Sequence, residues 1–168
     1  MVARTYTVAF VGVQARLVEV QCAVTAGLPA FSLVGLPDKA VSEARDRVRA
    51  AMSALSLALP SKRITVNLSP ADLPKEGSHF DLPIALALLA ALDVLPAEEV
   101  AQTVAMGELS LDGALVPVNG ALTISARSPA RCWTGLICAS KCHLSPTVTS
   151  TCRKPWKAPP RLQTASPM

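Results

Sequence analysis

The sequence predicts a two-layer α/β domain with a mostly antiparallel or mixed sheet in its first 122 residues. Two kinds of spacing predict this fold class. Apolar residues alternate with a period of two in several short segments, which is typical of half-buried strands. Two longer segments carry apolar residues at helical spacing, and the segments follow one another in the order β-β-β-α-β-α-β-β.

The first expected elements are two neighbouring strands that form a hairpin. Residues 16–24 alternate strictly, which places four apolar side chains on one face: Val18, Val20, Cys22 and Val24. A similar alternation just before them involves Tyr6, Val8 and Phe10. Ala15-Arg16 is short enough to join the two strands, although it lacks the usual Gly or Asn.

A short strand and an amphipathic helix come next. The strand covers residues 30–34, and Gly35-Leu36-Pro37 ends it. We expect Asp38 to cap the following helix, which runs to about residue 57 before Pro60 ends it. The apolar stripe of this helix recurs at three and four residues: Ala40, Ala44, Val48, Ala51, Met52 and Leu55.

A fourth strand, a long loop and a second helix follow. The strand covers residues 64–68, and residues 69–80 form the loop. We expect Asp81 to cap a helix over residues 82–92, with Pro83 in its first turn, where no N–H is missed. Because this helix is apolar nearly all round, it should lie at the centre of the domain.

The domain is expected to end with a short polar element and two strands. Glu98 and Glu99 lie on the short polar turn or helix. The strands cover residues 104–109 and 114–118 and flank a turn at Asp112-Gly113, as in a hairpin.

Charges and rare residue types divide the chain at Leu122. The residues up to this point include nine basic and all 12 acidic residues, a net charge of −3. The residues after it include seven basic and no acidic residues, a net charge of +7, together with four of the five cysteines and both tryptophans. We therefore assign residues 1–122 to a folded domain and residues 123–168 to an atypical, disordered tail.

The tail contains residue types that ligate zinc: Cys132, Cys138, Cys142, His143 and Cys152. Their spacing provides no Cys-x2-Cys or His-x3-His pair, so we expect no metal site. The acid-free composition, rich in Ser, Pro and Arg, resembles translation in a shifted reading frame. We hypothesise that the tail is a frameshift product.

The first part of the chain shows no membrane or secretory signal. Its longest charge-free apolar run, residues 82–92, is too short to cross a bilayer, which needs about 20 residues. The N-terminal residues lack the apolar core of a signal peptide. Since the single cysteine of the domain, Cys22, suits a reducing compartment, we expect a cytoplasmic protein without a membrane partner.

Several long runs carry a resemblance to a known family: residues 31–38, 43–49, 62–77, 80–85 and 107–113. Through them, residues 1–122 resemble the N-terminal domain of the ComM/YifB family of magnesium-chelatase-like AAA+ ATPases, and the chain looks like a truncated member. The resemblance implies a ribosomal protein S5 domain 2-like fold, which the proteolytic domain of Lon shares. It also implies an AAA+ module, a hexamer and DNA as partners in the full-length family, with a role in branch migration during natural transformation.

The chain departs from that family in its phosphate-binding residues. None of its eight glycines is followed by a lysine, so the Gly-x-x-x-x-Gly-Lys-[Ser/Thr] loop is absent from the sequence. ATP and magnesium are expected only for the ATPase module of the family. For this chain we expect no cofactor.

A Lon-like fold raises the question of a Ser–Lys catalytic dyad. When the nucleophile motif of Lon is laid on residues 74–77, the nucleophile position falls at His79, and Ser78 lies one residue early. The corresponding lysine position falls at Leu122, so neither half of the dyad is present. Because a serine without a base in reach is a weak nucleophile, we expect no enzymatic activity.

One polar cluster precedes the second expected helix and forms the candidate site: Lys75, Glu76, Ser78, His79 and Asp81. One interpretation is an anion or partner contact at the helix N-terminus, helped by the helix dipole. The other, which we favour, is loop chemistry alone. In that interpretation Asp81 caps the helix, Gly77 turns the chain and the other side chains are solvated.

Five basic residues lie on and after the first expected helix: Arg45, Arg47, Arg49, Lys62 and Arg63. Those on the helix alternate with acidic residues, and residues two apart on a helix point apart. We interpret them as a solvated helix face, with an i, i+4 ion pair between Glu43 and Arg47, rather than as a nucleic-acid patch.

These observations predict a noncatalytic accessory domain of a ComM-like AAA+ ATPase that processes DNA, here without the ATPase module. Two alternatives stay open. One is a degenerate Lon-like Ser–Lys peptidase, and the other is a small DNA-binding module.

Overall fold

The computed structural model describes residues 2–12, 14–118 and 135–138, and it contains one six-stranded sheet and one small two-stranded sheet. The strands of the large sheet are β1 (Val2–Val11), β2 (Gln14–Thr25), β3 (Ala30–Val34), β4 (Arg63–Ser69), β5 (Thr103–Met106) and β8 (Gly135–Cys138). The remaining elements are α1 (Lys39–Ala54), the 3-10 turn η1 (Ser78–Phe80), α2 (Asp81–Ala91), α3 (Ala97–Val100), β6 (Glu108–Leu109) and β7 (Leu115–Val116).

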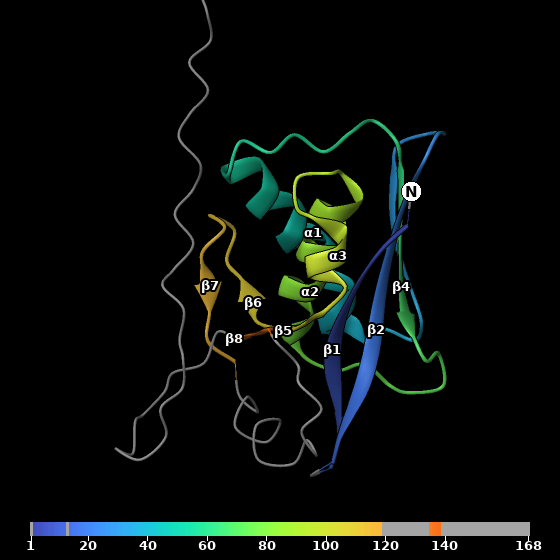
Figure 1. Cartoon of the computed structure of the whole chain (residues 1–168), viewed down its shortest axis with the longest axis vertical. Coiled ribbons are helices and arrows are strands. Elements are labelled where there is room, and N and C mark those ends of the chain that lie inside the picture. The colour runs from blue at the N-terminus through green and yellow to red at the C-terminus, as the bar shows by residue number, and fades with distance from the viewer. Residues whose placement is uncertain (1, 13, 119–134, 139–168) are drawn as a thin grey trace, which may run out of the picture.

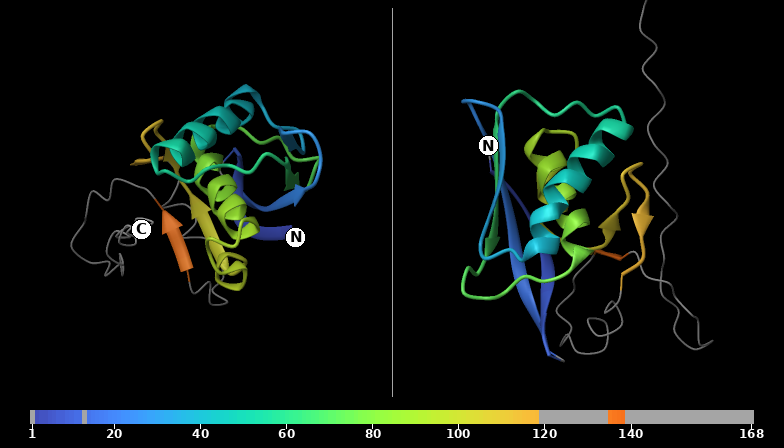
Figure 2. Two further views of the ribbon diagram at one scale, coloured as in Figure 1. Left: turned by 90° about the horizontal axis from the view of Figure 1, so that it is seen from above. Right: turned by 180° about the vertical axis from the view of Figure 1, so that it is seen from behind.

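The large sheet is mixed, with the strand order β3-β4-β2-β1-β5-β8. The pairs β1–β2 and β2–β4 are antiparallel, while β3–β4, β1–β5 and β5–β8 are parallel. The helices lie together on one side of the strands β1, β2 and β4 (Figure 1), and the views in Figure 2 show the same two layers. The predicted α/β class with a mixed sheet is therefore confirmed.

The hairpin β1–β2 differs from the prediction in its turn. Val11 pairs with Gln14, so the turn lies at residues 12–13 rather than at Ala15-Arg16. Gly12 has φ of 59°, a left-handed conformation that glycine adopts without steric cost. The turn therefore uses the glycine that the expected join lacked.

The inward face of β1 also differs from the prediction. Thr5 pairs with Val20 and Thr7 pairs with Val18, which are buried residues of β2. The residues of β1 on the same face of the sheet are therefore small: Ala3, Thr5, Thr7 and Ala9. Tyr6 and Phe10, which the alternation favoured, lie on the other face and are half-buried. Because α2 packs directly on β1 and β2, small side chains there allow the close approach of the helix.

Helix α1 begins as predicted and ends earlier than predicted. The Asp38 carboxylate accepts a hydrogen bond from the Val41 backbone N–H at 2.7 Å, which is the predicted N-cap. The helix ends at Ala54, and Ser56 follows with φ of 59°. Leu55, predicted to be in the apolar stripe, is exposed because the chain has already left the helix.

Helix α2 is buried along most of its length, as its composition predicted. The predicted strand over residues 104–109 is interrupted at Gly107, so β5 and β6 belong to different sheets. The Gly107 N–H donates to the His79 carbonyl at 3.1 Å, and the Gly107 carbonyl accepts from the Leu82 N–H at 3.0 Å. These bonds turn the backbone away from the large sheet and toward the start of α2.

Part of the region predicted to be a disordered tail forms a strand. Residues 135–138 are β8, which pairs in parallel with β5 from Thr103↔Gly135 to Met106↔Cys138. The rest of the predicted tail, and with it the other four residues considered for zinc, lies outside the described residues. In the described part of the chain, no helix is long and apolar enough to span a membrane.

Gly35, directly after β3, lies against the backbone of β4. Its φ is 109°, and a Cβ atom added there would lie 2.1 Å from the Leu68 carbonyl oxygen. Both the conformation and the contact exclude a larger residue, because the neighbouring atom is part of a paired strand and cannot move aside.

We expect Gly35→Ala to destabilise the domain by at least about 2 kcal/mol, since it adds a backbone clash to an unfavourable φ. The measurement is urea unfolding followed by circular dichroism. Gly12→Ala is the matched control, because φ is again positive but no atom lies within 4 Å of the added Cβ. Equal losses in the two variants would contradict the clash.

Candidate functional site

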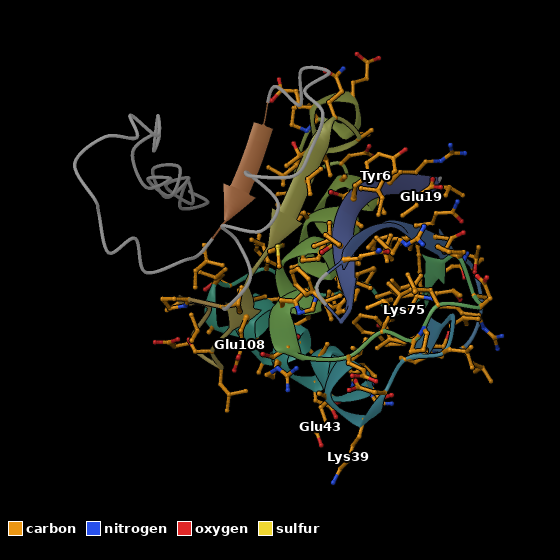
Figure 3. The ribbon with its side chains drawn as sticks, turned by 90° about the horizontal axis from the view of Figure 1, so that it is seen from below. Tyr6, Glu19, Lys39, Glu43, Lys75 and Glu108 are labelled. Atoms are coloured by element: carbon orange, nitrogen blue, oxygen red, sulfur yellow. The ribbon has the colours of Figure 1, made fainter. Side chains whose placement is uncertain are left out.

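The loop between β4 and α2 brings the predicted site residues close to α1 and β6. The loop leaves the lower end of β4 in Figure 1 and leads across to η1 and α2. In the view from below, Lys39 and Glu43 project outward from α1, while Lys75 lies among other side chains (Figure 3). The site is therefore an internal junction, and we describe it residue by residue.

Asp81 and Arg47 form a two-pronged ion pair at this junction. Arg47 Nε donates to Asp81 Oδ2 at 2.6 Å, and Arg47 Nη2 donates to Asp81 Oδ1 at 2.9 Å. The Leu109 N–H donates to the same Oδ2 at 3.1 Å, and Arg47 Nη2 also donates to the Ala40 carbonyl. Asp81 is fully buried, so this one carboxylate links α1, α2 and β6 inside the protein.

The protonation of this pair follows from its surroundings. The hydrogen bonds to Asp81 raise the pKa of the Arg47 guanidinium further, so it stays charged. Burial raises the pKa of the Asp81 carboxyl, while the bonds from Arg47 and the Leu109 amide act in the opposite direction. The prediction that Asp81 is a helix cap is wrong: Phe80 occupies the N-cap position, and the Asp81 side chain bonds to other elements.

His79 is buried beside the sheet. Its Nε2 is 2.8 Å from the Val8 carbonyl oxygen, which assigns the ring proton to Nε2. The ring also packs against Phe10 and Phe80, with centroids 5.7 Å and 4.4 Å away. Burial lowers the pKa of His79, so the ring is neutral at pH 7.

Lys75 is fully buried, which is unusual for a lysine. Its ammonium group donates a hydrogen bond to the Pro70 carbonyl at the other end of the same loop. Its backbone carbonyl accepts from the Asp38 N–H at 3.0 Å, and Pro37 and Lys75 form a parallel bridge. Burial lowers the pKa of Lys75.

Asp38 holds the loop against the N-terminus of α1. One carboxylate oxygen caps the helix, and the other accepts from the Gly77 N–H at 3.4 Å. Gly77 turns the chain as predicted, with φ of 95°. A hollow of about 270 Å³ lies beside this contact and is lined by Leu36, Pro37, Asp38, Pro74, Lys75 and Glu76.

The remaining two residues of the candidate site, Ser78 and Glu76, are not buried. Ser78 Oγ donates to Glu108 Oε2 at 2.5 Å, which connects η1 to β6. Glu76 is exposed and forms no ion pair with another described residue.

The structure thus brings four of the five predicted residues into one hydrogen-bonded junction, but it places them mostly inside the protein. The interpretation that all except Asp81 and Gly77 are solvated is wrong for Lys75 and His79. The reason is that η1 folds the loop inward beneath α2, which loop composition did not indicate. An anion or partner contact at this position stays a prediction.

Sequence reasoning missed the roles of Arg47, Asp38 and Glu108 in this junction. Arg47 was assigned to a solvated helix face, and its pair with Glu43 does form at 3.7 Å. Its principal partner is the buried Asp81. The sequence around Asp81 gives no sign of this pairing, because Arg47 lies on a different helix. Arg45, by contrast, is exposed and pairs with the adjacent Asp46, as expected of a solvated face.

The polar side chains of the junction bond to one another and to main-chain groups. The Ser78 hydroxyl faces a carboxylate, and the Nε2 of His79 bonds to a main-chain carbonyl. The N-terminus of α2, where a bound anion would be stabilised, already holds the Asp81 carboxylate. Among the residues that the structure describes, no group of three His, Cys, Asp or Glu side chains is arranged to hold a metal ion.

Comparison with known proteins assigns the family. The family model described as subunit ChlI of Mg-chelatase matches residues 18–141. The chain belongs to this ChlI family. The matched range includes all five candidate-site residues and β8, and it extends beyond Leu122, the predicted end of the domain.

Three curated relatives show how far the similarity of this ChlI family member reaches. The chain is 52% identical over 117 residues to Competence protein ComM of Haemophilus influenzae, and 49% identical over 118 residues to Uncharacterized protein YifB of Escherichia coli. It is 46% identical over 136 residues to Uncharacterized protein YifB of Salmonella typhimurium. The matches cover 70%, 70% and 81% of this chain but only 23%, 23% and 27% of the relatives.

We expect Arg47→Met to destabilise this ChlI-family domain by about 3 kcal/mol, because it leaves the buried Asp81 carboxylate without its cation. Urea unfolding measures the loss. Glu43→Gln, which removes the exposed partner of the same arginine, should cost at most about 0.5 kcal/mol. If the double variant Arg47→Met/Asp81→Leu were no more stable than Arg47→Met, the uncompensated carboxylate would not be the cause.

We also expect the stability of the domain to fall as the pH drops below 6.5, the ordinary pKa of histidine. Burial lowers the pKa of His79 in the folded state, so below pH 6.5 the unfolded chain binds a proton that the folded domain does not. The contribution of neutral His79 to the unfolding free energy is therefore fully present at pH values above 6.5, and it decreases as the pH falls below 6.5. The unfolding free energies of the wild type and of His79→Gln are measured from pH 7.5 to 5.5, and we expect the two values to converge as the pH falls. Parallel curves would show that His79 is not the source of the pH dependence.

Proposed function

We propose that the chain provides a noncatalytic accessory domain of a ComM-like AAA+ protein that processes DNA, with the ribosomal protein S5 domain 2-like fold. The observation that carries this proposal is the 52% identity to Competence protein ComM over 117 residues. Identity at this level over 117 residues supports a shared role of the matched segment. The ATPase module, the hexamer and the DNA belong to the proposal for the whole protein.

The proposed fold is supported by the arrangement of the two layers. A mixed sheet with β1 inside it carries α1 and α2 on one side, and the chain enters the sheet through an antiparallel hairpin. This topology is compatible with an S5 domain 2-like domain.

The noncatalytic role is supported by the way the reactive side chains are engaged. Lys75, His79 and Asp81 are buried and bond to Pro70, Val8 and Arg47. Burial raises the pKa of the Cys22 thiol to about 12, so it is not a thiolate at neutral pH. Ser78 donates to a carboxylate and has no lysine partner among the described residues, which argues against a Ser–Lys peptidase.

The accessory role is supported by the hydrogen bonds through which the junction joins several elements of the domain. Three secondary-structure elements meet at one carboxylate, and the loop before α2 is bonded to α1 through Asp38. A domain whose elements are joined in this way can hold a neighbouring module in a fixed orientation without taking part in catalysis. We propose that it orients the ATPase module of the longer protein.

A domain exchange in Haemophilus influenzae ComM tests the proposal. The 117 matched residues of ComM are replaced by the corresponding segment of this chain, and transformation frequency is measured in competent cells. We expect the exchanged protein to restore transformation above the level of a strain without ComM. The same exchange carrying Ser78→Ala should transform equally well, because the domain supplies no nucleophile.

The controls separate folding from function. Immunoblotting shows whether each exchanged protein accumulates, and a variant carrying Arg47→Met serves as the destabilised reference. A stable exchanged protein that transforms no better than the deletion strain would overturn the accessory role. Loss of transformation on Ser78→Ala alone would overturn the noncatalytic role.

A further inference from the structure

Strand β3 forms one edge of the large sheet. It pairs only with β4 among the described strands. The Ala30 N–H bonds toward β4, to the Lys62 carbonyl. Since alternate residues of a parallel strand face the same neighbour, the N–H and C=O groups of Phe31 and Leu33 face the open edge. Such an edge can accept a further strand from another chain.

A groove lies beside the start of this edge strand. It has a volume of about 450 Å³ and lies between α1, the segment from α1 to β4, and the first residues of β3. That segment crosses from the end of α1 to β4 in Figures 1 and 2. The apolar part of the groove is formed by side chains of these elements: Phe31, Leu57, Leu59 and Ile64. An apolar side chain from a strand added to β3 would fit this surface.

The polar part of the groove is cationic. Arg49 and Lys62 line it, and both are exposed. Neither forms an ion pair with another residue in the described part of the chain. The groove itself contains no acidic side chain. A ligand with carboxylates would therefore complement the groove.

We propose that the free edge of β3 and this groove bind an extended, acidic peptide segment of a partner protein. The segment adds to β3 as a strand, using the backbone groups of Phe31 and Leu33. One of its apolar side chains enters the groove, and its carboxylates pair with Arg49 and Lys62. This inference does not rest on the proposed function.

Two other occupants fit the surface less well. A second copy of this chain paired through β3 would offer residues 28–36, which contain no acidic residue to meet the cations. Single-stranded nucleic acid would need an accessible aromatic ring for base stacking, but Phe31, the aromatic residue of the groove, is only 7% exposed. The combination of an open edge, an apolar floor and two cations favours an acidic peptide.

Fluorescence anisotropy with the full chain tests this proposal. The probe is a fluorescein-labelled ten-residue peptide of alternating Glu and Val, compared with an alternating Lys and Val peptide and with an N-methylated Glu and Val peptide. We expect the first to bind and the other two to bind at least about tenfold more weakly, because one lacks carboxylates and the other lacks backbone donors. Rising salt should weaken the binding of the first.

Variants of the protein locate the binding. Arg49→Glu/Lys62→Glu should weaken binding of the Glu and Val peptide by at least about tenfold, while Arg16→Glu, an exposed cation at the far end of β2, should leave it unchanged. Thermal melts verify that all variants fold. Absence of peptide binding, equal binding by the groove variant, or tighter binding of a labelled oligothymidylate would overturn the proposal. So would a dimer in sedimentation equilibrium that excludes the peptide.

Discussion

The arrangement of the helical layer depends on one ion pair whose carboxylate is buried. Arg47 on α1 reaches across to Asp81, the first residue of α2, and the same carboxylate accepts the backbone N–H of Leu109 in β6. A carboxylate without exposed surface is tolerated only when its lone pairs are satisfied by a cation and by further donors. The positions of α1, α2 and β6 are therefore coupled, because moving any one of them leaves a buried charge or an unpaired amide.

Around this pair, further hydrogen bonds hold the loop before α2 against the rest of the domain. Lys75 closes the loop on itself through Pro70, Asp38 joins the loop to α1, and His79 anchors η1 to β1. A cluster of Lys, Glu, Ser, His and Asp within seven residues has the composition of an active site. In this ChlI-family chain, Lys75, His79 and Asp81 are instead buried and bonded to other parts of the domain.

Elements set by local pattern could be predicted from the sequence, while those set by distant contacts could not. The Asp38 cap, the limits of β3 and the apolar face of β2 follow from spacing within a few residues, and the structure confirms them. The pairing of Arg47 with Asp81 joins residues 34 positions apart, and no periodicity indicates it. Likewise, the small residues of β1 face α2 because of tertiary packing, although Tyr6 and Phe10 dominate the local pattern.

The place of β1 in the sheet has a consequence for how the chain is made. This strand comes first in the sequence, yet it lies between β2 and β5, and its parallel partner begins only at Thr103. During synthesis, β1 can close its hairpin with β2 early, but one side of it stays unpaired until more than half of the domain has been translated. The nascent chain thus passes through a stage in which a strand that finally lies inside the sheet is an exposed edge, open to pairing with other chains.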